Sequence, residues 1–250
     1  MDTKSKNDII SENIYKCRYG FLQSIIVDKS VKIKYDNNFL LRDFTDYTDV
    51  HVKSVHSLIL VKELIKKNPV IVNIVSSEFD GSALSLFDDF LAMKTNFCQC
   101  ISSELFPISK NIIYTPFISI IRDEEFKINI KSIVTSAMIT ASLVVNPRII
   151  EKKYMNLTDH TNTIEIIETI FQTCIKAGHD TIIFGNLACK YNKIPFEDIV
   201  DILNLSILKY GGSFKYIYFA IPRIDQFDAL QYDYFFKKII RPQELFITDE

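Results

Sequence analysis

Tryptophan is absent from this sequence and glycine is scarce, with six glycines among 250 residues. Loops that hold a phosphate group usually contain several glycines, because the missing Cβ lets backbone N–H groups approach the ligand closely. A chain with so few glycines can form only a few loops of this kind. The remaining composition, 48% hydrophobic and 24% charged residues, is that of an ordinary globular protein and excludes disordered, collagen-like and disulfide-scaffold classes.

A strong excess of one charge is also absent. The 29 Lys and Arg residues nearly balance the 31 Asp and Glu residues, so the whole chain exerts little attraction on nucleic acid or on an anionic membrane. One C-terminal segment combines cations with aromatic rings: Tyr232, Tyr234, Phe235, Phe236, Lys237, Lys238 and Arg241. Such a segment either binds a nucleic acid strand by stacking or packs its rings on a sheet as a helix. We expect the packed helix, and therefore no nucleic acid partner.

Patterns for disulfides and metal sites are missing as well. Five cysteines are an odd number, which favours reduced thiols in the cytoplasm or the nucleus. Cys98 and Cys100 lie too close together for the usual zinc spacing, and no histidine is near them. Ser76, Cys98 and Cys174 offer nucleophilic atoms, but no local pattern places a histidine or an aspartate beside them. We therefore expect neither a metal nor a cofactor.

Long hydrophobic runs do not occur either. The longest weakly polar run, residues 132–145, contains several Ser and Thr residues and is shorter than the ~18 apolar residues of a membrane span. The first residues are polar and of mixed charge, unlike a signal or transit peptide. We expect a soluble protein without a membrane partner.

Hydrophobic periodicity predicts that strands alternate with helices. Apolar runs rich in β-branched residues predict strands at residues 21–27, 31–35, 69–75, 112–114, 117–121, 132–138, 181–185 and 215–221. Apolar residues at helical spacing predict helices at residues 9–17, 52–67, 84–105, 161–177, 195–210 and 226–240. This order predicts a mostly parallel sheet with helices on both faces. Ligands of such sheets bind beyond the carboxyl ends of the strands, so the loops after residues 75, 138, 184 and 221 are the candidate binding loops.

Four segments carry a more specific pattern: residues 70–75, 113–123, 178–200 and 214–221. The first holds Asn73, and the third reads Gly-His-Asp, a hydrophobic strand, and a loop with Gly185 and Cys189. In this order the segments resemble the microbial type of poly(ADP-ribose) glycohydrolase, a divergent branch of the macrodomain fold. The resemblance spans about residues 9–222. It implies an ADP-ribose pocket between two loops, one over the distal ribose and one over the diphosphate.

The resemblance assigns the catalytic carboxylate to the first loop. In the family this loop has three glycines and then Gln-Glu-Glu, and the second Glu protonates the departing ribosyl oxygen. Here Gly81 alone remains, and the acid's position falls on Asp89, after Phe87 and Asp88. Aspartate is one methylene shorter, and a displacement of about 1 Å can cost on the order of a hundredfold in rate. Asp88 and Asp89 are thus catalytic candidates of a weakened enzyme, or carboxylates at a helix start without special function.

The ligand-binding residues that the resemblance implies are Asn73, Gly81, Gly185, Ala188, Cys189, Lys190 and Tyr191. The family's glycines fall on Ala188 and Lys190. The ammonium group of Lys190 can approach a diphosphate or lie in solvent like that of most lysines. The family's loop aromatic falls on Asn192, and Tyr191 can replace it if the loop shifts. Asn73 lies near the distal ribose in the family, and its other interpretation is an amide that bonds loop backbone groups.

The sequence therefore predicts an α/β macrodomain-like fold of three layers. We expect an N-terminal extension at residues 1–50, the core at residues 51–222 and a C-terminal helix and tail at residues 223–250, packed as one unit. The predicted function is binding of ADP-ribose or an ADP-ribosylated protein, with weak or lost ADP-ribosyl hydrolase activity. Two alternatives are an active glycohydrolase with Asp89 as general acid, and an interaction protein that keeps the fold without binding the ligand. The oligomeric state is not indicated.

Overall fold

The computed structural model describes residues 5–20, 22, 30–41, 48–75, 89–185 and 187–242. Its central sheet has seven strands: β1 (Val31–Lys34), β2 (Asp49–Lys53), β3 (Pro69–Val75), β4 (Asn111–Ile120), β5 (Val134–Ser142), β8 (Thr181–Phe184) and β9 (Tyr216–Ala220). They lie in the order β1-β4-β5-β3-β8-β9-β2. Neighbours from β5 to β2 pair in parallel, whereas β4 is antiparallel to both β5 and β1. The predicted mostly parallel α/β sheet is confirmed.

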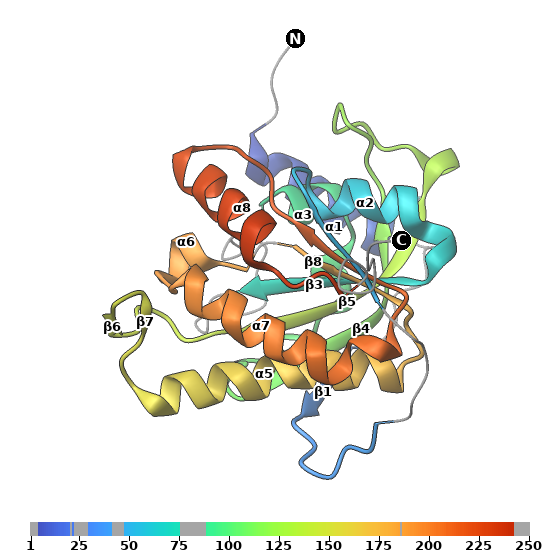
Figure 1. Cartoon of the computed structure of the whole chain (residues 1–250). Helices are drawn as coiled ribbons and strands as arrows, with labels where there is room; N and C mark the ends of the chain where they lie inside the picture. The colour runs from blue at the N-terminus through green and yellow to red at the C-terminus, as the bar shows by residue number, and fades with distance from the viewer. Residues whose placement is uncertain are drawn as a thin grey trace, which may run out of the picture.

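Helices cover both faces of the sheet (Figure 1). The longer ones are α1 (Lys6–Tyr19), α2 (Ser57–Leu64), α5 (Leu157–Lys176), α7 (Phe196–Tyr210) and α8 (Gln226–Lys238). The short ones are α3 (Asp89–Lys94), α4 (Phe97–Cys100) and α6 (Cys189–Asn192), with 3-10 turns η1 (Ile65–Lys67), η3 (Ser103–Leu105), η4 (Ile130–Ser132) and η5 (Gly211–Ser213). A small hairpin pairs β6 (Ile149–Ile150) with β7 (Lys153–Tyr154). Helices α5, α7 and α8 pack on one face, and α1 to α4 pack on the other.

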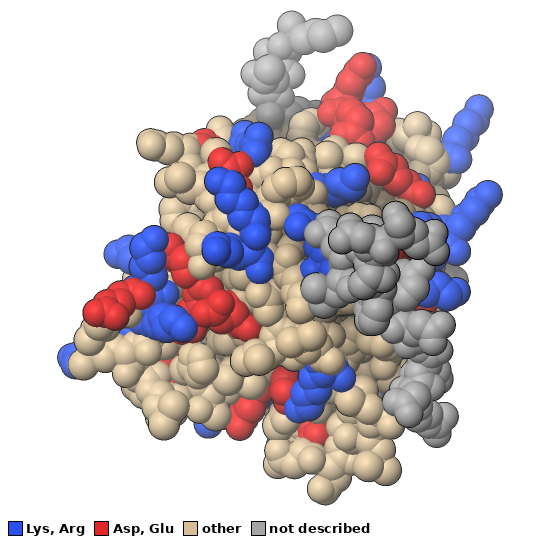
Figure 2. Space-filling view, viewed as in Figure 1, with Lys and Arg blue, Asp and Glu red and all other residues tan. Residues whose placement is uncertain are grey.

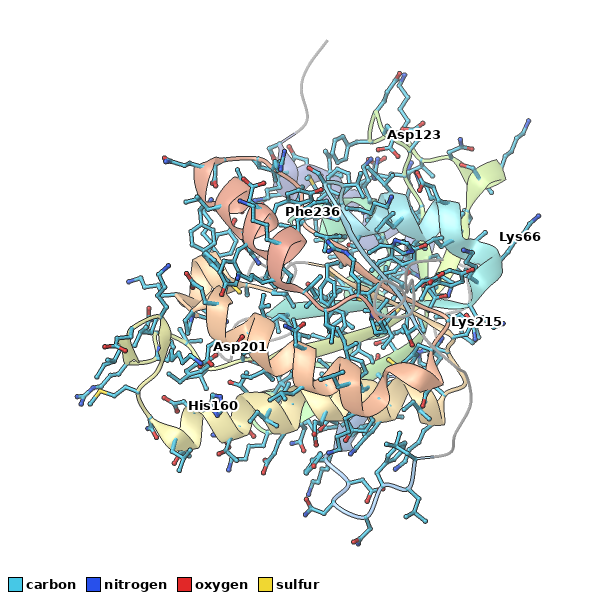
Figure 3. The ribbon with its side chains drawn as sticks, in the orientation of Figure 1. Lys66, Asp123, His160, Asp201, Lys215 and Phe236 are labelled. Carbon is cyan, nitrogen blue, oxygen red and sulfur yellow. The ribbon has the colours of Figure 1, made fainter. Side chains whose placement is uncertain are left out.

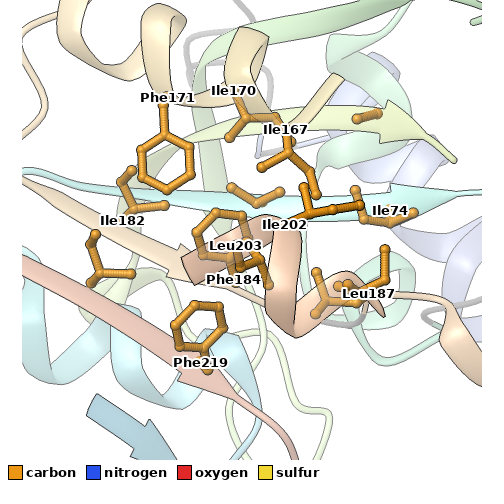
Figure 4. Packing of buried hydrophobic residues seen from close by; sticks show 14 of the residues in the cluster. Ile74, Ile167, Ile170, Phe171, Ile182, Phe184, Leu187, Ile202, Leu203 and Phe219 are labelled. Carbon is orange, nitrogen blue, oxygen red and sulfur yellow. The ribbon is translucent and has the colours of Figure 1, made fainter. Parts of the chain in front are cut away.

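The face under α5, α7 and α8 is filled with aromatic and β-branched side chains (Figure 4). Phe171 of α5 is fully buried, and its ring centroid lies 5.8 Å from those of both Phe184 and Phe214. Phe184 stacks on Phe219 of the neighbouring strand at 5.2 Å, and Phe235 of α8 packs on Phe219 from outside. Because helices cover both faces, every residue of β3 is buried, as its continuous apolar run predicts.

The face under α1 to α4 contains buried polar groups that link distant segments. The side-chain amide of Asn13 in α1 donates to the carbonyl oxygen of Met93 at 2.8 Å and accepts from Nε of Arg122 at 2.7 Å. The side chain of Lys94 is 1% exposed, bonds Glu124 at 2.8 Å and lies 4.4 Å above the ring of Phe90. These contacts join α1, α3 and the segment that follows β4.

The helix predicted at residues 52–67 is wrong in its first part. Residues 49–53 form β2, with Val50 and Val52 buried and His51 and Lys53 more exposed, which is the two-residue alternation of a strand. Helix α2 begins only at Ser57, where the His56 side chain accepts from the Leu58 N–H. The apolar residues at 52 and 55 mimicked a helical period across the turn between the two elements.

The long helix predicted at residues 84–105 is also wrong, because its described part is broken into α3, α4 and η3. The break lies at Thr95 and Asn96, where Asn96 Oδ1 accepts from the Ser119 N–H at 2.7 Å and Thr95 bridges to Ile120. A side chain that bonds backbone groups elsewhere competes with the helix. The two strands predicted around Pro116 are one strand, β4, which accommodates this proline in an irregularity between Thr115 and Ile118.

The other described elements agree with the sequence prediction within a few residues. Strand β5 begins two residues later than predicted and extends to Ser142. Helix α5 begins earlier, at Leu157, and is followed by Gly178 with a φ of 74°, the left-handed position that favours glycine. The strand predicted at residues 21–27 lies mostly outside the described part of the chain. The loop predicted at residues 76–83 lies entirely outside it.

Acidic and basic side chains are interspersed over the face shown in Figure 2, in keeping with the near balance of charges in the sequence. Within the part of the chain that the structure describes, no helix combines the length and apolarity needed to cross a bilayer.

Candidate functional site

The topology places one crevice at the carboxyl edge of the sheet. From β3 the chain continues to β4 and β5 on one side, and β8 later pairs with β3 on the other side. The direction of winding thus reverses at β3, and ligands of open α/β sheets bind at such a point. The loop that leaves β3, residues 76–88, lies outside the description, whereas the loop that leaves β8 is described except for residue 186.

The loop after β8 packs tightly against the sheet. The Gly185 N–H donates to the Val72 carbonyl oxygen at 3.0 Å. A Cβ at this position would lie 3.2 Å from that oxygen and 3.2 Å from Ser57 Oγ, so only glycine fits without displacing a neighbour. Ala188, for which the sequence resemblance predicted a glycine-like position, has a φ of 54° and precedes α6. This is the left-handed conformation that glycine adopts at lower cost.

A cavity of about 510 Å³ opens beside this loop. It lies between the start of α2, the loop after β8, the end of β9 and the first turns of α8. Its apolar wall consists of Ile59, Phe90, Leu187, Ala220, Ile221, Pro222 and Ile224. The volume falls within the roughly 300–1,000 Å³ of pockets for small molecules, which are mostly apolar with a few polar groups.

The polar groups of the cavity are His56, Ser57, Lys190, Tyr191, Asp228 and Gln231. His56 begins α2, and its ring centroid lies 4.2 Å from that of Phe90. Its Nδ1 accepts from the Leu58 N–H at 3.3 Å, which in the neutral ring leaves the proton on Nε2. Gln231 is buried, whereas Tyr191 is half-exposed at the rim. The site thus offers donors and acceptors around an apolar floor.

Lys190 of the cavity lining takes part in an ion pair with Asp225. The ammonium group of Lys190 bonds one carboxylate oxygen of Asp225, and the other oxygen accepts from the Asp228 N–H at 3.0 Å as the N-terminal cap of α8. The hydrogen bond from Lys190 lowers the pKa of Asp225, and the same bond raises the pKa of Lys190. Both groups are therefore charged at neutral pH.

Asn73 and Thr140 form a second polar pair in the core. They are register partners on β3 and β5, and both are buried. Their strand neighbours Val72 and Ile74 belong to the α5–α7 face, so Asn73 points to the opposite face, under α1 to α4. Within the described structure, Asn73 Nδ2 and Thr140 Oγ1 have no hydrogen-bond partner. Buried polar groups of this kind are costly and mark candidate functional positions.

The predicted site residues fall into three groups. Gly185, Lys190 and Tyr191 line the cavity. Ala188 and Cys189 are buried beside it, and Asn73 lies in the adjoining core. Gly81 and Asp88 lie outside the described residues, and Asp89 begins α3 with its side chain outside the description. The arrangement of the candidate catalytic carboxylates therefore stays a prediction.

Sequence reasoning missed the parts of the cavity that come from α2, α3 and α8. His56, Phe90, Asp228 and Gln231 lie up to 175 residues apart in the chain, and no local motif joins them. One signal was available for His56, because a residue with a side-chain acceptor before a run of apolar residues is a helix start. The loop after residue 221, which the sequence indicated as a candidate binding loop, supplies Pro222 and Ile224 to the cavity.

Other titratable residues have structural roles. His179 Nδ1 donates to the Asn68 carbonyl oxygen at 3.1 Å, so its Nε2 accepts from the Tyr114 hydroxyl at 2.9 Å, and burial lowers the pKa of this histidine. Burial raises the pKa of the Cys98 and Cys189 thiols to about 12, which keeps them protonated. Within the described residues, no group of His, Cys, Asp and Glu is arranged to hold a metal ion.

The aromatic C-terminal segment is helix α8. Phe235 is fully buried on the sheet, and Tyr234 packs edge-on against Phe196 of α7. Phe236, labelled in Figure 3, is half-exposed and stacks on Tyr232. These contacts agree with a helix that packs aromatic rings on the sheet and keeps lysines outward.

No family model and no curated protein sequence matches the chain. Solved structures do match. Poly(ADP-ribose) glycohydrolase from Thermomonospora curvata has a TM-score of 0.73 and 13% identity, and the match covers 93% of this chain and 98% of that one. The same enzyme from Deinococcus radiodurans in complex with ADP-ribose has a TM-score of 0.68 and 13% identity over 80% and 86% of the two chains. The Thermomonospora enzyme bound to the inhibitor ADP-HPD has a TM-score of 0.67 and 12% identity over 93% and 98%. The chain thus has the fold of the microbial poly(ADP-ribose) glycohydrolases.

Proposed function

We propose that the protein binds ADP-ribose, free or attached to another protein, and that its ADP-ribosyl hydrolase activity is weak or lost. The observation that carries this proposal is the cavity of about 510 Å³ at the carboxyl ends of β8 and β9, beside β3, where the winding of the sheet reverses. It lies in a fold whose solved examples include a complex with ADP-ribose. Ligand pockets of doubly wound sheets form at this place, which supports the assignment.

The chemistry of the cavity supports a nucleotide-sized ligand. Phe90, Ile59 and Ile221 give an apolar surface for a planar base, and His56 and Gln231 offer hydrogen bonds to its edge. Gly185 lets the loop after β8 pack closely against β3 and the start of α2, which positions this wall of the cavity. Lys190 supplies a cation where the family has a glycine. A point charge on a flexible stem replaces backbone donors less specifically, which favours binding over efficient catalysis.

The hydrolase alternative depends on Asp89. Its carboxyl group would protonate the ribosyl oxygen as the glycosidic bond breaks, and the shorter side chain would place it about 1 Å from the position of a glutamate, at a cost on the order of a hundredfold in rate. The remaining alternative is an interaction protein that binds no nucleotide.

Calorimetry with ADP-ribose tests the binding proposal. We expect saturable heat for the natural protein and none for Ile224→Trp, since Ile224 is 80% exposed at the cavity and an indole there fills the opening without disturbing the core. Leu208→Trp on the exposed side of α7 is the matched control and should bind like the natural protein. Absence of heat and of any thermal shift at millimolar ADP-ribose would leave only the interaction protein.

Release of ADP-ribose from a modified protein separates binder from enzyme. We expect the natural protein to release little, and Asp89→Ala to release no less than the natural protein. A clear rate that disappears in Asp89→Ala, while calorimetric binding persists, would establish the active glycohydrolase instead.

A further inference from the structure

The ion pair between Lys190 and Asp225 joins two of the loops that border the cavity. Lys190 belongs to α6, directly after the loop that leaves β8, and lines the cavity. Asp225 follows the loop that leaves β9 and caps α8. The bond between them is therefore a link between the carboxyl ends of two neighbouring strands.

This bond sets the net charge that an anionic ligand encounters in the cavity. Among the described residues that line the cavity, Lys190 is the sole Lys or Arg and Asp228 is the sole Asp or Glu. The cation is already neutralised by Asp225, and the acidic residue of the cavity lining, Asp228, adds a negative charge. A ligand with a diphosphate group therefore meets a site whose net charge is unfavourable until Lys190 is released.

We propose that Asp225 is a specificity-determining residue, because its carboxylate competes with ligand phosphate for the ammonium group of Lys190. The inference rests on the proposed nucleotide site and adds a direction to it: the natural protein favours the nucleoside part of its ligand over the diphosphate part. A ligand phosphate that binds Lys190 displaces one oxygen of Asp225 and leaves the helix cap in place, since the cap uses the other oxygen.

A ligand phosphate can replace the Asp225 carboxylate as the partner of Lys190. The side chains of Lys190 and Asp225 are 41% and 40% exposed, so solvent reaches both partners. Exposed ion pairs shift an equilibrium by only about twofold to fivefold. A dianionic ligand can overcome such a bond, and the bond remains strong enough to reduce the measured affinity.

Asp225→Asn tests the proposal, because asparagine caps a helix as well as aspartate does but carries no charge. Calorimetric titrations use adenosine, ADP and ADP-ribose as probes at low salt. We expect Asp225→Asn to bind ADP and ADP-ribose about threefold to fivefold more tightly than the natural protein, with the affinity for adenosine unchanged. In the Lys190→Gln background the same substitution should produce no such gain.

Asp233→Asn is the matched control. Asp233 lies on the same helix and pairs with Arg223 at 2.5 Å, with comparable exposure, but it does not line the cavity. It should leave all three affinities unchanged, which separates a local effect from the change in net charge.

Three results would overturn the inference alone. ADP-ribose could bind equally to the natural protein and to Asp225→Asn, or Asp225→Asn could increase the affinity for adenosine as much as that for ADP. The third is a gain that persists in the Lys190→Gln background. If none of the probes binds to the natural protein or to any variant that unfolds cooperatively, the proposed function fails and the inference fails with it.

Discussion

The two faces of the sheet are buried in different ways. Under α5, α7 and α8 most contacts with the sheet are apolar, with Phe171 against Phe184 and Phe184 against Phe219, and the buried polar side chains such as Gln172 and Asp198 lie on the helices. Under α1 to α4 the apolar cluster is interrupted by buried polar side chains: Asn13, Asn73, Lys94, Asn96 and Arg122. Apolar contacts are not directional, whereas hydrogen bonds to buried groups fix the positions of the segments that they join.

This difference bears on the candidate site. Both α2 and α3, which supply His56 and Phe90 to the cavity, pack on the polar face. Phe90 lies under Lys94, whose ammonium group bonds Glu124. We infer that the apolar face supplies most of the stability and that the polar face sets the position of one cavity wall. Substitutions on the two faces should therefore have effects that differ in size and in kind.

The largest effect is expected on the apolar face. Phe171→Ala removes a fully buried ring from contact with Phe184, Phe214 and Tyr210, and should lower the free energy of unfolding by about 3–5 kcal/mol. Urea unfolding followed by circular dichroism measures this loss as a lower midpoint. The control Leu208→Ala, at a 62% exposed position of α7, should change the free energy by less than about 0.5 kcal/mol. Equal midpoints for the two variants would contradict the inference that the apolar face supplies most of the stability.

The accuracy of the sequence prediction also differs between the two faces of the sheet. The apolar elements β3, α5 and α7 were predicted within a few residues, because their residue periods and end signals are local. The polar face produced the error at residues 84–105, since Asn96 ends the helix by bonding Ser119, a contact across 23 residues that no local pattern encodes. Asn13 and Arg122 lie 109 residues apart, and their pairing was not predictable at all.

The candidate site follows the same rule. The loop after β8 was found because its motif is contiguous, and three of its predicted residues line the cavity: Gly185, Lys190 and Tyr191. The walls from α2 and α8 were missed, because only the folded sheet brings them to that loop. The ion pair of Lys190 with Asp225 spans 35 residues, and no sequence period indicates it.

An intermediate effect is expected from Asn13 on the polar face. Asn13→Ala leaves the Arg122 Nε and the Met93 carbonyl without their partner in a buried environment, which should lower the free energy of unfolding by about 1–3 kcal/mol. Unlike Phe171→Ala, it should also weaken ADP-ribose binding in calorimetry, because α3 carries Phe90 into the cavity wall. Ser11→Ala, at an exposed position of α1, is the control. Loss of stability without any change in binding would break the proposed link between the polar face and the cavity.

The smallest effect concerns Glu124, the exposed end of the Lys94 contact. Its hydrogen bonds to Lys62 and Lys94 lower the pKa of its carboxyl group from 4.5 to about 2. A lowered folded-state pKa means that this contribution is fully present above about pH 4.5 and is lost as the pH falls towards 2. Because Glu124 is 61% exposed, solvent screening limits the loss of unfolding free energy in Glu124→Gln to roughly 1 kcal/mol or less at pH 7.

The difference in unfolding free energy between Glu124→Gln and the natural protein should shrink between pH 6 and pH 2.5. Glu125→Gln, which disrupts a pair exposed by more than 70% on both sides, should show no measurable difference at either pH. A Glu124→Gln deficit that is the same at both pH values would show that its cause is packing around Lys94 rather than the charge of Glu124.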